Sequence, residues 1–205
     1  CAGCDVAEGL EQGDYDVIKV MNRRTKEVVI TYHAHIDPDL LAEEQHKLFL
    51  LLNKDLYIAT ERNNHGLTTI ITAFKLGVKQ YYSEDFNKGY PVSTDYLGFK
   101  TTGGSRTPAI NDLKEWIREG EYVDHEKEFW MEALNFVRNS KGKMQAVDKD
   151  KNPATRCFDD RIFASLIMLR CHLWLPNYSF TPPKIEYEWL RKKIKSRLRT
   201  SAMSK

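Results

Sequence analysis

Residues 58–66, Ile-Ala-Thr-Glu-Arg-Asn-Asn-His-Gly, end an apolar run with a carboxylate and place five polar or small residues behind it. The run over residues 56–60 is typical of a short buried strand, and a helix is predicted to begin at Gly66. Glu61 therefore lies at the tip of a buried strand, where a charge is costly unless a partner binds it. This junction favours an α/β fold with a ligand site at one edge of its sheet.

Three strands are expected before this junction. They cover residues 2–6, 16–21 and 27–35, and a turn joins the last two as a hairpin. A helix over residues 38–53 follows, because Asp37 can cap it and a proline occupies its first position. Antiparallel first strands followed by right-handed crossovers predict a mixed sheet with helices on both faces.

The second half of the chain continues with further αβ units. Its expected elements are a helix at 66–76, a strand at 78–82, a loop-rich insertion at 83–104, a helix at 107–119, a strand at 122–124, mixed signals at 126–138, a strand at 144–147 and a helix at 159–174. We expect residues 1–178 to form one domain and residues 179–205 to form a basic helical tail.

The composition is that of a folded globular protein. The chain has 205 residues, enough for one good-sized core, and 41% of them are apolar. No apolar run approaches 18 residues and no signal peptide is recognisable, so neither a membrane span nor secretion is expected. The four cysteines fit packing roles in a reducing compartment better than disulfides or a zinc site. They are Cys1, Cys4, Cys157 and Cys171.

The net charge of +2 is unevenly distributed. Residues 184–205 contain eight Lys or Arg and two Glu, which gives this segment +6 and leaves −4 for the rest. A basic helical pattern of this kind can bind a phosphate backbone, an acidic partner or a membrane surface. A solvated terminal helix explains the pattern equally well.

Four carboxylates are expected to meet at one edge of the sheet. Asp5 lies in the first strand, and it lies beside Glu61 if the two strands are parallel neighbours. Asp159 and Asp160 open the last helix, whose N-terminus would bring them to the same edge. Carboxylates so close together cannot all be ionised without cations, and Mg²⁺ or Mn²⁺ is the natural partner. Two such ions about 3.5–4 Å apart suit phosphodiester hydrolysis.

Each acid also has a simpler explanation. Asp159 could be an ordinary N-cap, and Glu61 could pair with Arg62 or Arg161 at the surface. Asp5 is harder to explain in this way because Asp is depleted in strands. Together, their positions at the ends of elements favour a metal site.

Four sequence blocks, taken in order, resemble the nuclease domain of the large terminase subunit of tailed bacteriophages. They are AGCDVAEG…GDYDV, ATERNNHG, GFKTTGGSRTPAINDLKEWIREGEYV and DDRIFASLI, and the resemblance covers residues 2–174. That family has an RNase H-like fold related to RuvC-type resolvases. It holds two metal ions with acids on the first strand, the fourth strand and the last core helix. These positions correspond to Asp5, Glu61 and the pair Asp159–Asp160.

The resemblance implies a two-metal endonuclease that cuts concatemeric viral double-stranded DNA during genome packaging in the host cytoplasm. It also implies three protein partners, namely an ATPase motor domain, a portal and a small terminase subunit. No GxxxxGK[ST] motif occurs in the sequence, so the chain corresponds to the nuclease half alone.

The sequence departs from the family at one informative place. Many members have a His before the paired aspartates, whereas this chain has Cys157 and Phe158. This leaves open which aspartate binds metal directly. We favour Asp160, with Asp159 assisting or binding the second ion, and expect Asp5 to bridge both ions.

Several polar side chains near the acids are candidates for substrate contacts. Asn63, Asn64 and His65 could bind the scissile phosphate or orient water beside a helix N-terminus, or they could serve only as loop and cap residues. Lys100, Arg106 and the basic tail are candidates for phosphate contacts that are independent of sequence, and Arg161 is a further candidate for substrate binding. Two other functions fit the same pattern. One is a RuvC-like junction resolvase and the other a non-catalytic DNA-binding or assembly module.

Overall fold

A four-stranded mixed sheet forms the centre of the computed structural model, which describes residues 1–7, 13–63, 65–78, 81–83, 97–147 and 157–176. The strands are β1 (Ala2–Asp5), β2 (Asp16–Asn22), β3 (Glu27–Ala34) and β4 (Ile58–Thr60), in the order β3-β2-β1-β4. The first three pair in an antiparallel manner, and β4 pairs with β1 in parallel. The predicted mixed sheet is confirmed.

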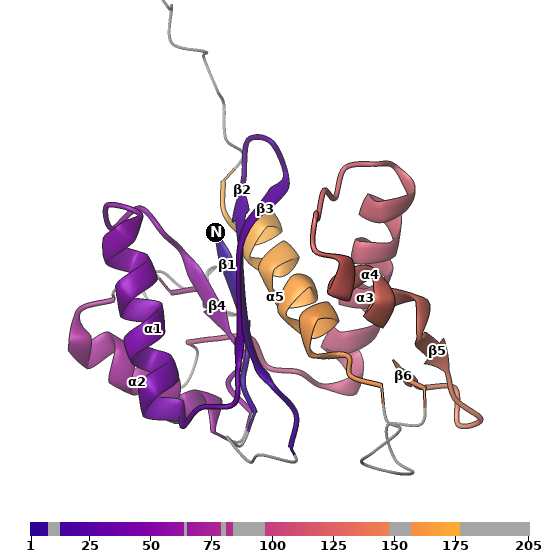
Figure 1. Ribbon diagram of the computed structural model, residues 1–205, viewed down its shortest axis with the longest axis horizontal. Helices are drawn as coiled ribbons and strands as arrows, with labels where there is room; N and C mark the ends of the chain where they lie inside the picture. Colours follow the sequence, from indigo (N-terminus) through magenta and orange to yellow (C-terminus); the bar gives the residue numbers. More distant parts are fainter. Residues whose placement is uncertain (8–12, 64, 79–80, 84–96, 148–156, 177–205) are drawn as a thin grey trace, which may run out of the picture.

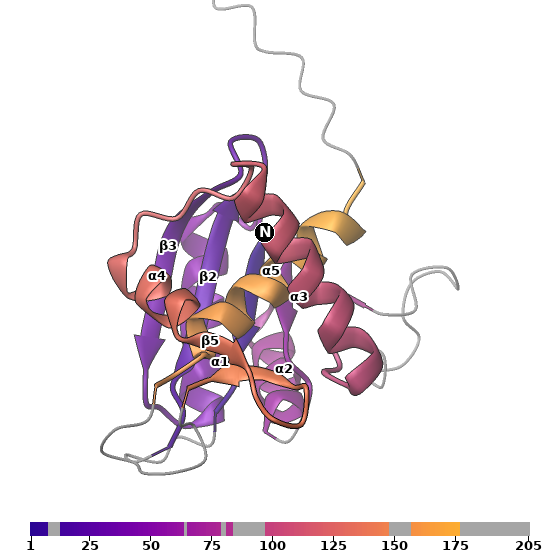
Figure 2. The ribbon, with the colours of Figure 1, turned by 90° about the vertical axis from the view of Figure 1, so that its right-hand side faces the viewer.

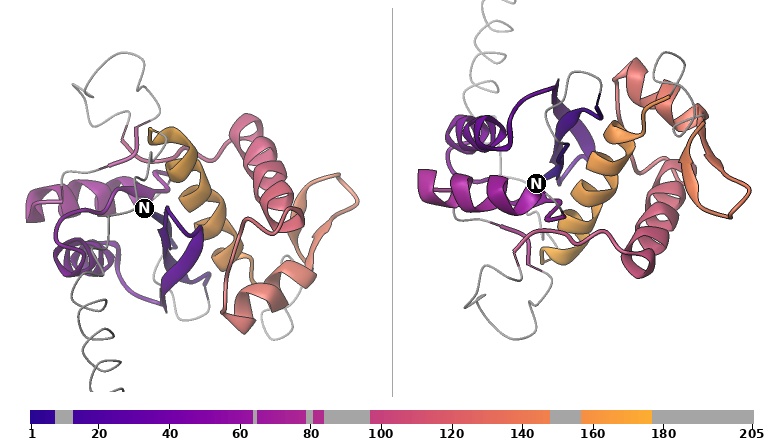
Figure 3. Two further views of the ribbon diagram at one scale, coloured as in Figure 1. Left: turned by 90° about the horizontal axis from the view of Figure 1, so that it is seen from above. Right: turned by 90° about the horizontal axis from the view of Figure 1, so that it is seen from below.

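Helices cover both faces of this sheet, as predicted (Figure 1). On one face lie α1 (Pro38–Leu51) and α2 (Gly66–Leu76), and on the other lie α3 (Gly103–Arg118) and α5 (Asp160–Trp174). Seen from the ends, these helices and the sheet form separate layers (Figure 3). Outside α5 lie α4 (Lys127–Leu134) and a hairpin of β5 (Phe136–Arg138) and β6 (Met144–Ala146) (Figure 2).

Two apolar cores separate the layers. Ala2 and Cys4 pack in the core beneath α1 and α2, so the alternation of side chains along β1 turns Gly3 and Asp5 toward α5. In β4, Ile58 packs in the same core as Ala2, and Ala59 packs in the core on the α5 side. The sheet thus presents its β1 acid to the layer that contains α5.

Gly3 allows α5 to lie directly on β1. A Cβ atom at this position would lie 2.2 Å from the carbonyl oxygen of Ala164 and 2.2 Å from the amide nitrogen of Met168. No side chain larger than hydrogen fits there without a backbone shift. The close approach fixes where the N-terminus of α5 lies relative to the end of β1.

The prediction for α3 was wrong at its N-terminus. The helix begins at Gly103 rather than at residue 107, because Thr102 and Ser105 form a capping box. The Gly103-Gly104 pair falls in the predicted loop-rich insertion, and glycine disfavours helix interiors. The tertiary position and the cap override that propensity.

Other boundaries also differ from the predictions. Residues 79–80 of the strand expected at 78–82 lie outside the described residues, and Tyr81 forms a bridge with Ile58. The strand expected at 122–124 is reduced to a bridge between Glu27 and Val123. The mixed signals at 126–138 resolve into α4 followed by β5. Residues 84–96 of the expected insertion and the basic tail at 179–205 lie outside the described residues. No helix in the described part of the chain is long and apolar enough to cross a membrane.

Candidate metal centre

Asp5 and Glu61 lie at the ends of two hydrogen-bonded parallel strands. Cys4 is paired with Thr60, and the amide of Glu61 donates to the carbonyl oxygen of Cys4 at 2.8 Å. The next residue on each strand is an acid, and both acids are half-buried. The predicted parallel neighbours are therefore present, and they place these two carboxylates side by side at one edge of the sheet.

The chain turns sharply from β4 into α2 behind Glu61. A Cβ atom at Gly66 would lie 1.6 Å from the carbonyl oxygen of Glu61, so only glycine fits at the start of this helix. Asn63 supports the turn because its Nδ2 donates to Oε1 of Glu61 at 3.3 Å and to the carbonyl oxygen of Thr101 at 2.9 Å. Asn63 therefore acts on the orientation of Glu61.

Asp159 and Asp160 lie where α5 begins, and each side chain is only 1% exposed. Oδ2 of Asp160 accepts a hydrogen bond from the amide of Tyr15 at 2.9 Å, and Oδ2 of Asp159 accepts one from the amide of Ala146 at 3.2 Å. Tyr15 immediately precedes β2, whose first residues pair with the end of β1. The start of α5 thus lies at the same edge as Asp5.

Asp159 is not an ordinary helix cap. It occupies the N-cap position of α5, but its side chain makes no capping hydrogen bond. Its carboxylate instead bonds to β6, in the neighbouring hairpin. The simpler explanation of this acid, as a local cap, is therefore wrong.

Arg106 of α3 brings a positive charge to the acids. Burial lowers the pKa of its guanidinium, while the charges of Asp159, Glu61 and Asp5 act in the opposite direction. The guanidinium lies over the ring of Phe163, 4.4 Å from its centre, and its Nη2 donates to a backbone carbonyl oxygen of β6 at 2.6 Å. One arginine is therefore within electrostatic reach of three of the four predicted site acids.

The carboxylate oxygens are suitable ligands for a hard divalent cation, although their side chains are not arranged around a common point. Oxygen ligands from carboxylates are those that Mg²⁺ and Mn²⁺ prefer. Among the described residues, however, no group of three or more His, Cys, Asp or Glu side chains is arranged to hold a metal ion. Asp159 and Asp160 each direct one oxygen at a backbone amide. The structure thus places carboxylates of the right type at one edge of the sheet but does not arrange them in the coordination geometry of a metal ion.

The remaining predicted substrate contacts have different surroundings. His65 is exposed at the N-cap of α2 and makes no side-chain cap bond. Lys100 is exposed, and its carbonyl oxygen accepts from Oγ of Ser105 at 2.6 Å. Asn64 lies outside the described residues. Contacts of these side chains with a substrate stay predictions.

Arg161 has a structural role that the sequence did not indicate. Its Nε donates to Glu126 at 2.6 Å, and its Nη1 donates to Glu132 at 2.7 Å. Glu126 also accepts from the fully buried Lys19, which lies 2.5 Å from Asp124. Burial acts to raise the pKa of Glu126, but the bonds from Arg161 and Lys19 lower it overall. This network holds α4 against β2 and α5, so Arg161 has a structural role that competes with its predicted role in substrate binding.

An aromatic stack beside the acids was also missed. The ring of Tyr15 lies 4.0 Å from that of His33 and 3.7 Å from that of His35, and Phe158 contacts it edge-on at 5.0 Å. Burial is the main cause that lowers the pKa of His33, to about 4. His33 lies in β3 and His35 just beyond its end, and their spacing of two residues could have indicated a shared face.

Asp16 is a structural acid. Its Oδ1 accepts a hydrogen bond from the amide of Ala7 at 2.9 Å, and its Oδ2 accepts one from the amide of Ile36 at 3.4 Å. Burial raises its pKa. Asp16 ties the segment after β1 to the end of β3 and is not grouped with the four candidate ligands.

The order of the strands in the sheet and the flanking helices are those of an RNase H-like α/β fold. Solved structures similar to this chain include those of a large terminase nuclease from the thermophilic phage G20c. The cobalt-bound form has a TM-score of 0.61 at 16% identity and the magnesium-bound form a TM-score of 0.59 at 18% identity, each covering 83% of this chain and 79% of the other. A third structure of that nuclease has a TM-score of 0.56 at 17% identity, covering 83% of this chain and 80% of the other.

At such identities the likeness establishes the fold, and at that level it confirms the resemblance predicted from the sequence. No protein-family model and no curated protein matches the chain.

Proposed function

We propose that the chain is a metal-dependent endonuclease and the nuclease part of a large terminase. Its substrate is double-stranded DNA, cut as concatemers during viral genome packaging in the host cytoplasm. The observation that carries this proposal is the pairing of Asp5 with Glu61 at the ends of two parallel strands, with the acids of α5 at the same edge. Structures with this fold include a terminase nuclease bound to cobalt and to magnesium.

The four carboxylates would hold two Mg²⁺ or Mn²⁺ ions. Asp5 would contact both, Glu61 one and Asp160 the other, with Asp159 assisting. When bound, such ions supply activation of a water molecule and stabilisation of the leaving 3′ oxygen. Asn63 holds the Glu61 carboxylate in place through its bond to Oε1.

Arg106 has a separate task in this proposal. Its guanidinium partly balances the charge of the acids, and it can bind a phosphate oxygen of the substrate. The motor domain, portal and small terminase subunit would bring the DNA to this edge, so the isolated chain should cut more weakly than the complete assembly.

A non-catalytic DNA-binding module on the same fold is the second candidate. The two candidates differ in one observable, which is cleavage.

Cleavage of a supercoiled plasmid tests the proposal. We expect nicked and linear products with Mn²⁺ or Mg²⁺ and none with EDTA, and we expect linear duplexes to be cut as readily as four-way junctions. Cutting that persists in EDTA would contradict the metal requirement. Cutting of junctions alone would identify a resolvase, and DNA binding without cutting in either metal would identify a non-catalytic module.

A further inference from the structure

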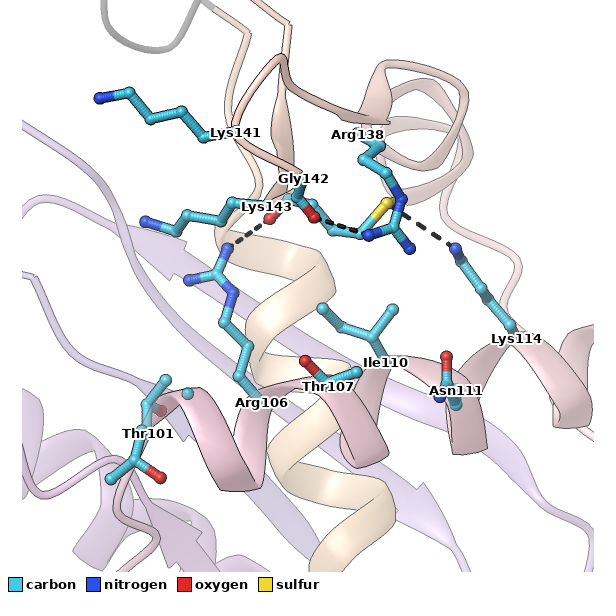
Figure 4. Close-up of a pocket in the computed structure, with 13 residues that line it drawn as sticks. Thr101, Arg106, Thr107, Ile110, Asn111, Lys114, Arg138, Lys141, Gly142 and Lys143 are labelled. Carbon is cyan, nitrogen blue, oxygen red and sulfur yellow. Dashed lines mark hydrogen bonds between the residues drawn. The ribbon is translucent and has the colours of Figure 1, made fainter.

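A groove lined by basic side chains lies between α3 and the β5–β6 hairpin (Figure 4). Its volume is about 440 Å³. Five basic residues, three from the hairpin and two from α3, line this basic groove: Arg106, Lys114, Arg138, Lys141 and Lys143. The groove thus joins two elements that are distant in the sequence.

No acidic side chain within the basic groove balances its charge. None of the 13 residues that line it is acidic, and none of the five basic ones forms an ion pair within the described part of the chain. The two arginines donate to neutral carbonyl oxygens, Arg106 to Met144 and Arg138 to Gly142, each at 2.6 Å. Lys141 and Lys143 are exposed at the turn of the hairpin. An anionic ligand would therefore meet positive charge that no carboxylate in the groove offsets.

The basic groove begins beside the candidate metal centre. Arg106 is within electrostatic reach of Asp5, Glu61 and Asp159, and it also lines the groove. Lys114 follows on α3 after about 12 Å of helix, which corresponds to about three or four nucleotides at a rise of about 3.4 Å each. A nucleic acid strand that crosses the acids would thus continue along the groove.

The N-terminus of α3 opens into the same groove. Thr102, Gly103 and Arg106 all line it, and the first amides of a helix have no partner within the helix. The amide of Ser105 donates to Oγ1 of Thr102 at 3.1 Å, which leaves the amides of Gly103 and Gly104 as the donors that a phosphate could reach. The dipole of this 16-residue helix adds partial positive charge at that point.

We propose that the basic groove binds the phosphate backbone of one DNA strand next to the cleavage position and does so independently of sequence. This inference rests on the proposed function. Phosphate contacts from Lys and Arg fix the position of a duplex without reading its bases. The apolar lining is limited to Ile110 and Met144, which favours a polyanion over a protein segment anchored by apolar side chains.

Neutralising the three lysines of the groove tests this proposal. The variant is Lys114→Gln/Lys141→Gln/Lys143→Gln, and its matched control is Lys47→Gln/Lys54→Gln/Lys75→Gln, whose exposed residues belong to the α1–α2 side of the sheet. Binding of a fluorescent 30-base-pair duplex is measured by anisotropy in Ca²⁺ from 50 to 200 mM salt. The slope of log K against log salt should fall by about 2 to 3 in the groove variant, because each lost phosphate contact removes about 0.9.

The expected loss of affinity is about tenfold or more at the lower salt concentration, with the control unchanged and duplexes of unrelated sequence affected equally. An unchanged slope and affinity in the groove variant would overturn the proposal. The proposal would also be overturned if the groove substitutions weakened binding to a poly-glutamate peptide more than binding to the duplex. The natural ligand of the groove would then be an acidic protein.

The outcome is separable from that of the proposed function. If the wild type cuts no DNA in any metal, but its slope of log K against log salt is larger than that of the groove variant, the endonuclease proposal fails and the proposal for the groove stands. If the wild type cuts DNA and the groove variant binds and cuts equally well, the groove fails and the endonuclease stands.

Discussion

The side chains around Glu61 have different roles. The carboxylate ends β4, Gly66 lets α2 pass against its carbonyl oxygen, and the Nδ2 of Asn63 bonds to its Oε1 at 3.3 Å. The polar residues that follow this strand therefore do not share one purpose. Asn63 orients the acid, whereas His65 is exposed and makes no side-chain cap bond.

Replacing Asn63 by Ala should weaken cleavage without unfolding the protein. The lost bond leaves Glu61 free to rotate, and outer partners of metal ligands typically change metal affinity or activity by about 10- to 100-fold. We therefore expect the Mn²⁺ concentration for half-maximal cleavage to rise by about tenfold. The measurement is a Mn²⁺ titration of the plasmid cleavage rate.

Asn135→Ala is the matched control for this substitution. Its Nδ2 also donates to a backbone carbonyl oxygen, that of Met131 at 2.9 Å, but it is not bonded to a predicted metal ligand. Its Mn²⁺ requirement should equal that of the wild type. An equal shift in both variants would show that the Asn63 effect is only structural.

The meeting of the candidate acids at one edge of the sheet could be predicted from the sequence because they occur at the ends of apolar elements, whereas their binding of metal stays a prediction. The partners of Lys19 and Arg161 could not. Lys19 bonds to Asp124 across 105 positions of the chain, and no local pattern indicates which distant carboxylate a buried lysine meets. A lysine in the middle of an apolar strand signals only that some partner must exist.

At the scale of elements, the contact between α5 and β1 determines where two of the acids lie. The helix rests on Gly3, and its N-terminus carries Asp159 and Asp160 to the end of β1. The amides of Tyr15 and Ala146 then fix the two carboxylates from either side. The site therefore depends on a glycine that is remote from the chemistry.

Gly3→Ala should destabilise the protein. The added methyl group would clash with the backbone of α5 at 2.2 Å, and overpacking of a core typically costs about 1–3 kcal/mol and occasionally more. We expect a loss of at least about 2 kcal/mol in the free energy of unfolding, measured by urea denaturation. Cleavage should also fall because the α5 acids move relative to Asp5.

Gly103→Ala provides the comparison for the same chemical change. Its Cβ would meet no atom within 4 Å, so the change should be neutral or stabilising by up to about 1 kcal/mol. A Gly3→Ala variant as stable as Gly103→Ala would contradict the close packing of α5 on β1.

The boundary of α3 shows what local patterns miss. Two glycines and a proline predict a late start to this helix, yet the capping box of Thr102 and Ser105 starts it at Gly103, and Pro108 lies within it. The two glycines occupy the first two positions of the helix, whose amides have no partner within it. Pro108 is the sixth residue, so its missing N–H removes one helical hydrogen bond, which the helix tolerates. The missed turn is also the one that opens into the basic groove.

At the scale of the whole molecule, the order of the strands in the sheet can be predicted from the sequence more readily than the grooves on the surface. A hairpin, a helix and a buried strand that ends in an acid restrict the topology to a few arrangements, and the predicted one is present. The basic groove was not predicted because its lysines come from α3 and from a hairpin that the sequence signals did not resolve. Only folding brings them together.

The cleavage activity of Asp5→Asn tests the central claim most directly. Asn keeps the shape of the side chain and removes the charge of the acid expected to contact both ions. In Mn²⁺ the wild type should nick and linearise a supercoiled plasmid, and Asp5→Asn should do neither, while its circular dichroism spectrum and urea midpoint show an intact fold. Cleavage by Asp5→Asn at the wild-type rate would contradict the account.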